Sequence, residues 1–259
     1  PEPSNEKIKD AITAGLNAMA SAGVTSIHEA GMTPKDVKAF ISLAESNSLP
    51  IRVYGMLDGN NDELMKHWFA RGPLVDKSGF LDIRSIKVFY DGSLGSRTAL
   101  MEEPYSDQIG KSLATERIST KKILQLGRKA ADKGFQMAVH AIGDKGNNQV
   151  LKLYEEILDT NGIFDHRWRI EHAQVLFPNF YSRAAELKVL ASIQSSHAVG
   201  DSKWAEDRIG SERIQDAYAW QNILKSGVRL LLNSDLPGEP WKPMETLYFA
   251  VNRKPLDST

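Results

Sequence analysis

Two of the six histidines occupy positions from which they could bind a metal ion. His140 ends the apolar run 135–140, and His172 ends the apolar run 168–172. If these runs are consecutive parallel strands, their carboxyl ends lie at one edge of the sheet and the two imidazoles stand side by side. Converging neutral imidazoles suit a divalent metal. A hydrogen-bonded pair that orders loops is the alternative, and the residues alone leave both open.

Asp235 adds a carboxylate to this set. It follows the apolar run 228–233, so it lies just beyond the end of the last expected strand. Burial beside a metal would make it a ligand or a proton shuttle. Taken alone, the segment Asn-Ser-Asp-Leu-Pro would be an Asx-type turn before Pro237.

Lys87 lies within an otherwise apolar run, 83–90. An inward-facing ammonium ion is costly in a barrel interior. We therefore expect Lys87 to pair with Asp91 or Glu29, to reach the rim, or to react with CO₂ and form an anionic carbamate that could bridge two metals. An outward-facing lysine is the remaining alternative, because strand alternation does not exclude it.

These side chains must be positioned by an alternation of short apolar runs with stretches of helical period. We expect strands at 23–29, 51–57, 83–90, 135–140, 168–172, 190–194 and 228–233, and helices at about 6–20, 34–47, 60–70, 119–133, 147–158, 178–187 and 212–226. Repeated strand–helix–strand units imply parallel pairing with right-handed crossovers. Neither glycine-rich nucleotide-binding fingerprint occurs, which favours a barrel over an open doubly wound sheet.

Ionisable residues at or after several strand ends also favour a barrel, because its active site lies at that rim. They are His28, Lys87, Asp91, His140, His172, His197 and Asp235. We predict one α/β domain over residues 1–259, a TIM-type (β/α)8 barrel with seven of its strands. The irregular connection at 92–118 is a possible substrate loop or lid. His67 and His166 lie among charged neighbours and are interpreted as surface residues.

The composition excludes several other kinds of site. The 259 residues include no cysteine, with 32 Lys+Arg against 33 Asp+Glu and a net charge of −1. Any metal site must therefore use histidine, carboxylate or modified lysine ligands. The balanced charge provides no excess of basic residues of the kind that binds nucleic acid or anionic lipid. No apolar run reaches the length of a membrane span. We expect a cytoplasmic protein that acts on a small molecule.

Six segments together resemble the amidohydrolase superfamily, in the amidohydrolase 3 group that includes N-substituted formamide deformylases and exoenzyme-regulatory-protein-like hydrolases. Their order along the chain is the family's order, and they extend over nearly its whole length. They are Gly23-Val-Thr-Ser-Ile-His-Glu-Ala-Gly, Ile86-Lys-Val-Phe-Tyr-Asp-Gly-Ser-Leu-Gly-Ser-Arg-Thr-Ala, Val139-His-Ala-Ile-Gly-Asp, Ile170-Glu-His-Ala-Gln, the segment 194–210, and Leu231-Leu-Asn-Ser-Asp-Leu-Pro.

The resemblance implies a hydrolase of non-peptide carbon–nitrogen bonds with one or two Zn²⁺ ions. It implies that the bridging carboxylated lysine is Lys87, that His140 and His172 are metal ligands, and that Asp235 is a ligand and general acid/base. In such an enzyme the metals lower the pKa of a bound water, and the aspartate passes a proton to the leaving nitrogen. Substrate contacts are expected from three further residues, Arg97, His197 and Asp91.

The chain departs from the family pattern in one large respect. Members carry a His-x-His pair on a first barrel strand that follows a small β-rich domain, and this chain has no His-x-His. We expect a fragment that lacks the first strand and the β-domain, with weak or partial metal occupancy. Its open edges predict a homo-oligomer. Two alternatives stay open: a catalytically silent scaffold, and a mononuclear deaminase-like member that does not need Lys87.

Overall fold

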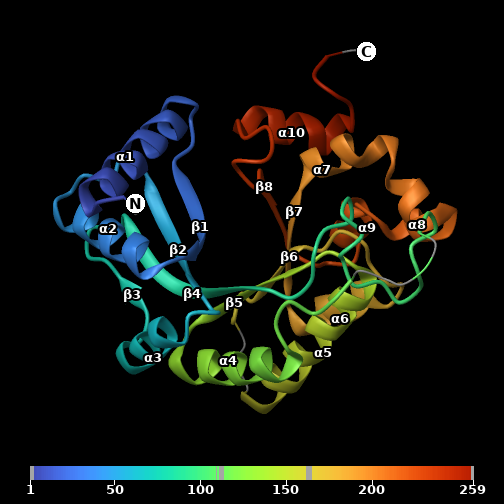
Figure 1. Ribbon diagram of the computed structural model, residues 1–259, viewed down its shortest axis with the longest axis horizontal. Coiled ribbons are helices and arrows are strands. Elements are labelled where there is room, and N and C mark those ends of the chain that lie inside the picture. The colour runs from blue at the N-terminus through green and yellow to red at the C-terminus, as the bar shows by residue number, and fades with distance from the viewer. Residues whose placement is uncertain (1–2, 109, 111–113, 162–164, 258–259) are drawn as a thin grey trace. The chain divides into compact units, whose positions relative to one another are not determined.

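The computed structural model of the chain describes residues 3–108, 110, 114–161 and 165–257. Figure 1 labels its elements. The strands are β1 (Ser26–Met32), β2 (Arg52–Asp58), β3 (Leu74–Val75), β4 (Leu81–Phe89), β5 (Gln136–Ala141), β6 (Arg169–His172), β7 (Leu190–Gln194) and β8 (Leu230–Asn233). The α-helices are α1 (Asn5–Ser21), α2 (Pro34–Glu45), α3 (Asp62–Arg71), α4 (Thr120–Lys133), α5 (Asp144–Asn161), α6 (Phe180–Leu187), α7 (Ser195–Gly200), α8 (Ala205–Arg213), α9 (Trp220–Lys225) and α10 (Pro243–Asn252).

The strand order is sequential. Neighbours in the sheet follow the path β1-β2-β4-β5-β6-β7-β8, and β3 pairs antiparallel with β4 beside that path. The pairs β1–β2, β2–β4, β5–β6, β6–β7 and β7–β8 are parallel. A doubly wound sheet would reverse its order at a switch point, whereas a barrel does not. The seven expected strands all form, and the two-residue β3 was missed because it is too short to show a pattern.

Contacts divide the chain into two compact units. The N-terminal unit extends to Val88 and includes Lys129–Met137, and the C-terminal unit holds Phe89–Arg128 and Ala138 onward. In the N-terminal unit α2 begins where the sequence specifies, because Thr33 and Asp36 form a reciprocal capping box. Its core packs around the buried side chains Val53, Leu57, Ile83 and Ile86 of β2 and β4.

Two buried regions stabilise the C-terminal unit. Every residue of β6 and β7 is buried, as expected for parallel strands covered on both faces. A second cluster lies beneath the connection that follows β4; its buried members are Leu94, Ala99, Tyr105, Ile142, Val175, Ala205, Ile209 and Ala217. The first half of this connection is therefore packed against the unit rather than projecting from it. The connection expected at 92–118 also includes residues 109 and 111–113, which lie outside the described residues.

Two local expectations were wrong. The helix expected at 212–226 is broken: α8 ends at Arg213, a 3-10 turn covers Ile214–Asp216, and α9 begins only at Trp220. Ala217 is extended (φ −96°, ψ 140°) and Tyr218 is left-handed (φ 52°), so the helical path cannot continue through them. His166 is buried rather than exposed, because its Nε2 bonds the Leu187 carbonyl at 2.7 Å and its Nδ1 accepts from the Trp168 amide. None of the described helices has the length and apolar character needed to cross a membrane.

Candidate functional site

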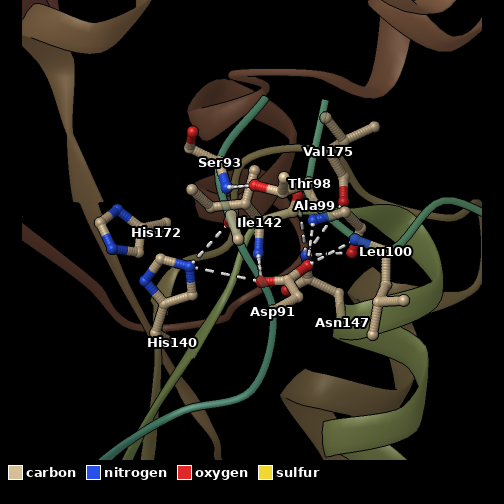
Figure 2. Close-up of polar contacts among 12 residues, drawn as sticks. Asp91, Ser93, Thr98, Ala99, Leu100, His140, Ile142, Asn147, His172 and Val175 are labelled. Carbon is tan, nitrogen blue, oxygen red and sulfur yellow. Dashed lines mark hydrogen bonds and ion pairs between the residues drawn. The ribbon is translucent and has the colours of Figure 1, made fainter. Parts of the chain in front are cut away.

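The two strand-end histidines meet in the C-terminal unit. In the parallel pairing of β5 with β6, His140 lies opposite Glu171 and Ala141 lies opposite His172. The imidazole centroids are 4.4 Å apart, and the residues are 9% and 8% exposed. Figure 2 shows the two rings together. The structure thus brings together the pair that strand order placed at one edge.

One ring nitrogen of His140 is hydrogen-bonded and the other is not. Nε2 lies 2.9 Å from the Gly92 carbonyl oxygen, and because a carbonyl only accepts, Nε2 carries the proton. Asp91 Oδ1 lies 3.3 Å from the same nitrogen (Figure 2). Nδ1 is buried and has no hydrogen-bond partner among the described residues. His140 therefore offers a lone pair on Nδ1.

His172 is oriented by a side-chain amide. Its Nδ1 lies 2.7 Å from Gln194 Oε1, while Gln194 Nε2 donates to Asn233 Oδ1 at 2.9 Å. The Gln194 amide is thus turned with its oxygen toward the imidazole, so Nδ1 donates and Nε2 is the lone-pair nitrogen. His172 and Ala173 have φ of 76° and 43°. Such backbone in non-glycine residues costs about 1–3 kcal/mol per residue and concentrates at functional sites.

His197 and Asp235 extend this row of side chains. The His197 ring stacks on His172 at 11°, with 5.8 Å between centroids. His197 Nε2 lies 3.9 Å from both Asp235 Oδ2 and Glu239 Oε1. The Asp235 side chain is 51% exposed, and its backbone is left-handed at φ 54°. Glu239 carries no signal in the sequence, because it lies in the irregular segment between β8 and α10.

The other expected site residues have different surroundings. Arg97 donates from Nε and from a terminal nitrogen to the Asp107 carboxylate, both at 2.9 Å. This bond raises the pKa of Arg97 and lowers the pKa of Asp107. Asp91 is fully buried and accepts from backbone amides. Lys87 lies in the N-terminal unit, where it is 4% exposed and pairs in register with Asp58.

A polar cluster that lies beside the histidines was not predicted from the sequence. Tyr218 donates its hydroxyl to Asp201 Oδ2 at 2.6 Å, and Gln174 Nε2 donates to the Tyr218 hydroxyl at 2.8 Å. Burial raises the pKa of Asp201. Gln174 and Tyr218 line a small cavity together with His172 and His197. Gln174 and Asp201 both lie in segments that carry the family resemblance, which is the signal that could have found them.

The donor chemistry of the histidine pair fits a divalent metal. Each imidazole has one nitrogen bonded to a protein oxygen, as metal-binding histidines do. The buried, unpartnered Nδ1 of His140 is the observation that carries this fit. Within the described ranges, no three histidine, aspartate or glutamate side chains are already gathered around one point that could hold an ion.

A sequential parallel sheet with polar side chains at its strand ends is the arrangement of a barrel whose functional site lies at that rim. The sequence pattern of the amidohydrolase family, in its amidohydrolase 3 group, matches residues 1–258, and the chain belongs to this family. The putative amidohydrolase YtcJ of Bacillus subtilis (strain 168) is 32% identical over 260 residues, which cover 98% of this chain and 47% of that protein. N-substituted formamide deformylase of Arthrobacter pascens is 24% identical over 252 residues, covering 92% of this chain and 44% of that protein.

The structural comparison confirms the fold. An uncharacterized metal-dependent hydrolase from Pyrococcus horikoshii OT3 matches with a TM-score of 0.86 and 30% identity, over 97% of this chain and 49% of that chain. The fold is accordingly an incomplete TIM-type barrel, as the sequence predicted. The chain spans about half the length of these relatives.

Proposed function

We propose that this chain carries the catalytic barrel residues of a metal-dependent hydrolase that cleaves carbon–nitrogen bonds in small, non-peptide amides. The observation that carries the proposal is the His140–His172 pair, with one nitrogen of each ring held by a protein oxygen. The relative named N-substituted formamide deformylase supports an amide-type bond. A resident Zn²⁺ would lower the pKa of a bound water and polarise the amide carbonyl.

The residues proposed to hold zinc are His140 through Nδ1, His172 through Nε2, Asp235, and Lys87 in its carboxylated form. Asp235 is also the proposed general acid/base: it takes a proton at its carboxylate and returns it to the leaving nitrogen. Its left-handed backbone and 51% side-chain exposure leave the carboxylate accessible to substrate.

His197 is the proposed contact to the substrate carbonyl. Its ring stacks on His172, and its side chain is 17% exposed at the small cavity. Arg97 is less well placed for this task, because both of its donating groups already bind Asp107. Glu239, at the same 3.9 Å from His197 Nε2 as Asp235, is a second acidic neighbour that holds this imidazole.

The test is a zinc titration of the chain by calorimetry with elemental analysis, beside an assay for formate release from N-substituted formamides. His140→Ala and His172→Ala should each weaken zinc binding by at least about tenfold. The control is His67→Gln, which alters an exposed histidine of α3. Equal zinc binding in all three variants and the unaltered chain would refute the proposed site.

The same titration distinguishes the proposed hydrolase from two alternatives, a catalytically silent scaffold and a mononuclear deaminase-like protein. A catalytically silent scaffold predicts less than one tightly held zinc and no amide turnover. A mononuclear, deaminase-like protein predicts that Lys87→Ala leaves zinc content and activity unchanged, whereas a carboxylated bridging lysine predicts the loss of one metal. Lys87→Arg keeps the charge but cannot form the carbamate, so it should behave as Lys87→Ala does.

We also propose that the chain self-associates through its sheet edges. In the part of the chain that the structure describes, β1 pairs with β2 and β8 pairs with β7, and each stands at one end of the strand order. An edge strand offers unpaired amide and carbonyl groups to another chain. Light scattering at micromolar concentration should report a dimer or larger species, and a monodisperse monomer would contradict the proposal.

A further inference from the structure

Asp91 lies at the point where two connections and one histidine meet. It follows β4 by two residues, and its side chain is 0% exposed. Oδ2 accepts from the amides of Leu100 at 3.0 Å and Gly143 at 2.9 Å, and Oδ1 accepts from the Ile142 amide at 3.0 Å. The carboxylate therefore joins the connection after β4 to the connection after β5 (Figure 2).

The same carboxylate also reaches the imidazole of His140. Oδ1 lies 3.3 Å from His140 Nε2, on which the Gly92 carbonyl also acts as an acceptor at 2.9 Å. Both neighbours of this nitrogen are acceptors, so the arrangement favours the tautomer with the proton on Nε2. The opposite tautomer would set a lone pair against two oxygens and place a proton on the buried Nδ1, which no described group accepts.

Close packing holds the carboxylate itself in place. Gly146, in the first turn of α5, has no side chain where Asp91 lies: a Cβ there would stand 2.6 Å from Oδ2. With three amide donors and this contact, Asp91 has little freedom to turn away from His140. A side chain so enclosed is unsuited to contact a substrate, which is the role that the resemblance implied.

We propose that Asp91 is a positioning residue, which fixes the protonated nitrogen and the orientation of the His140 imidazole so that Nδ1 is presented as a donor. The consequence for metal affinity rests on the proposed function, whereas the tautomer does not. A carboxylate or carbonyl behind a ligating histidine typically changes metal affinity by about 10–100-fold.

The competing explanation is that Asp91 only ties two connections together, and Asp144 is the matched control for that. Asp144 Oδ1 accepts from the amides of Glu102 at 2.9 Å and Lys145 at 2.8 Å, and the residue is 8% exposed. It therefore ties the connection after β4 to the start of α5 as Asp91 does. No contact between Asp144 and His140 is found among the described residues.

The experiment is long-range ¹H–¹⁵N NMR on the histidine-labelled, metal-free chain at alkaline pH, where imidazole is neutral. Unaltered His140 should show a single tautomer with the proton on Nε2. In Asp91→Asn the remaining oxygen stays with the two amides that Oδ2 accepts, so the new NH₂ replaces Oδ1 and faces Nε2, where it opposes the Gly92 carbonyl. Both tautomers should then appear, and zinc should bind about 10–100-fold more weakly. Asp144→Asn should leave the tautomer and the zinc affinity unchanged.

Three outcomes would overturn the proposal: a proton on Nδ1 in the unaltered chain, a single Nε2–H tautomer retained in Asp91→Asn, or equal loss of zinc affinity in Asp91→Asn and Asp144→Asn. If Asp91→Asn fails to fold, Gly146→Ala displaces the same carboxylate and should mix the tautomers, and the measurement on the unaltered chain needs no variant. Failure of the unaltered chain to bind zinc would refute the proposed function but leave the tautomer result standing.

Discussion

Asn147 should be among the most sensitive positions for stability in the C-terminal unit. It is 0% exposed on α5, and its Nδ2 donates to the carbonyls of Ile142 at 3.2 Å, Gly143 at 2.9 Å and Val175 at 3.0 Å. These carbonyls lie just after β5 and β6, the strands that carry the two histidines. An amide has two hydrogens, so the three contacts amount to two full bonds. The Ile142 and Gly143 carbonyls also accept the backbone amides of Val175 and Asn147, so they keep a partner when the side chain is removed. The cost is therefore two hydrogen bonds, at about 0.5–1.5 kcal/mol each, and about 1 kcal/mol or more for the Val175 carbonyl, which loses its side-chain donor.

We therefore expect Asn147→Ala to lower the free energy of unfolding by about 2–4 kcal/mol. The matched control is its neighbour Asn148, whose Oδ1 accepts from Arg183 at 2.9 Å. Arg183 keeps its bonds to Glu155 when Asn148 is removed, so Asn148→Ala should cost only about 0.5–1 kcal/mol. Urea denaturation followed by tryptophan fluorescence measures both, and Trp168 reports from the same unit.

A second substitution at the same position tests the hydrogen bonds rather than the volume. Asn147→Asp has nearly the same size but sets a carboxylate against three carbonyl oxygens, so at neutral pH it should destabilise the unit more than Asn147→Ala does. The reasoning is refuted if Asn147→Ala costs no more than Asn148→Ala, or if the aspartate variant is as stable as the unaltered chain.

Three further predictions concern the surroundings of the site. Gly143→Ala should prevent the connection after β4 from docking, because the new Cβ would lie 2.0 Å from a backbone oxygen of that connection; faster amide hydrogen exchange there is the readout. Arg97 lowers the pKa of Asp107, so their pairing stabilises the fold above the unfolded pKa of about 3.9 and is lost as the pH falls through the lower folded value. Acid titrations should thus show less pH dependence in Asp107→Asn, and an identical profile would contradict the pairing. Gln194→Leu should weaken zinc binding by about tenfold or more while Gln194→Glu retains it, because only glutamate keeps an acceptor for His172 Nδ1; equal affinities in a calorimetric titration would contradict this.

The strands were predictable because buried strands are visible in the sequence as short runs rich in apolar residues. Parallel strands covered on both faces are rich in apolar residues, as β5 is, with Met137, Ala138 and Val139. β6 is buried at every residue too, although only Ile170 of its four residues is apolar. The break in the helix expected at 212–226 was not predictable in this way. It depends on the extended backbone of Ala217 and the left-handed backbone of Tyr218, and neither residue type predicts such a conformation.

The site was predictable only where regular structure places it. His140 and His172 are neighbours because β5 and β6 pair in parallel, and that follows from the strand order. The surroundings of Asp91 and Arg97 depend on the path of an irregular connection. Asp91 accepts from amides about fifty residues away in the sequence, and hydrogen bonds of this kind have no periodic pattern.

Ionic contacts tether the connection after β4 to α8, and this affects how it can move. Asp107 binds the guanidinium groups of both Arg97 and Arg208, and Arg213 donates to the Glu103 carbonyl. Dissolved ions screen these charges and weaken the ionic part of the tether, whereas the buried Leu94, Ala99 and Tyr105 anchor the same segment independently of salt. Added salt should therefore speed amide hydrogen exchange around Asp107 more than around the buried Tyr105.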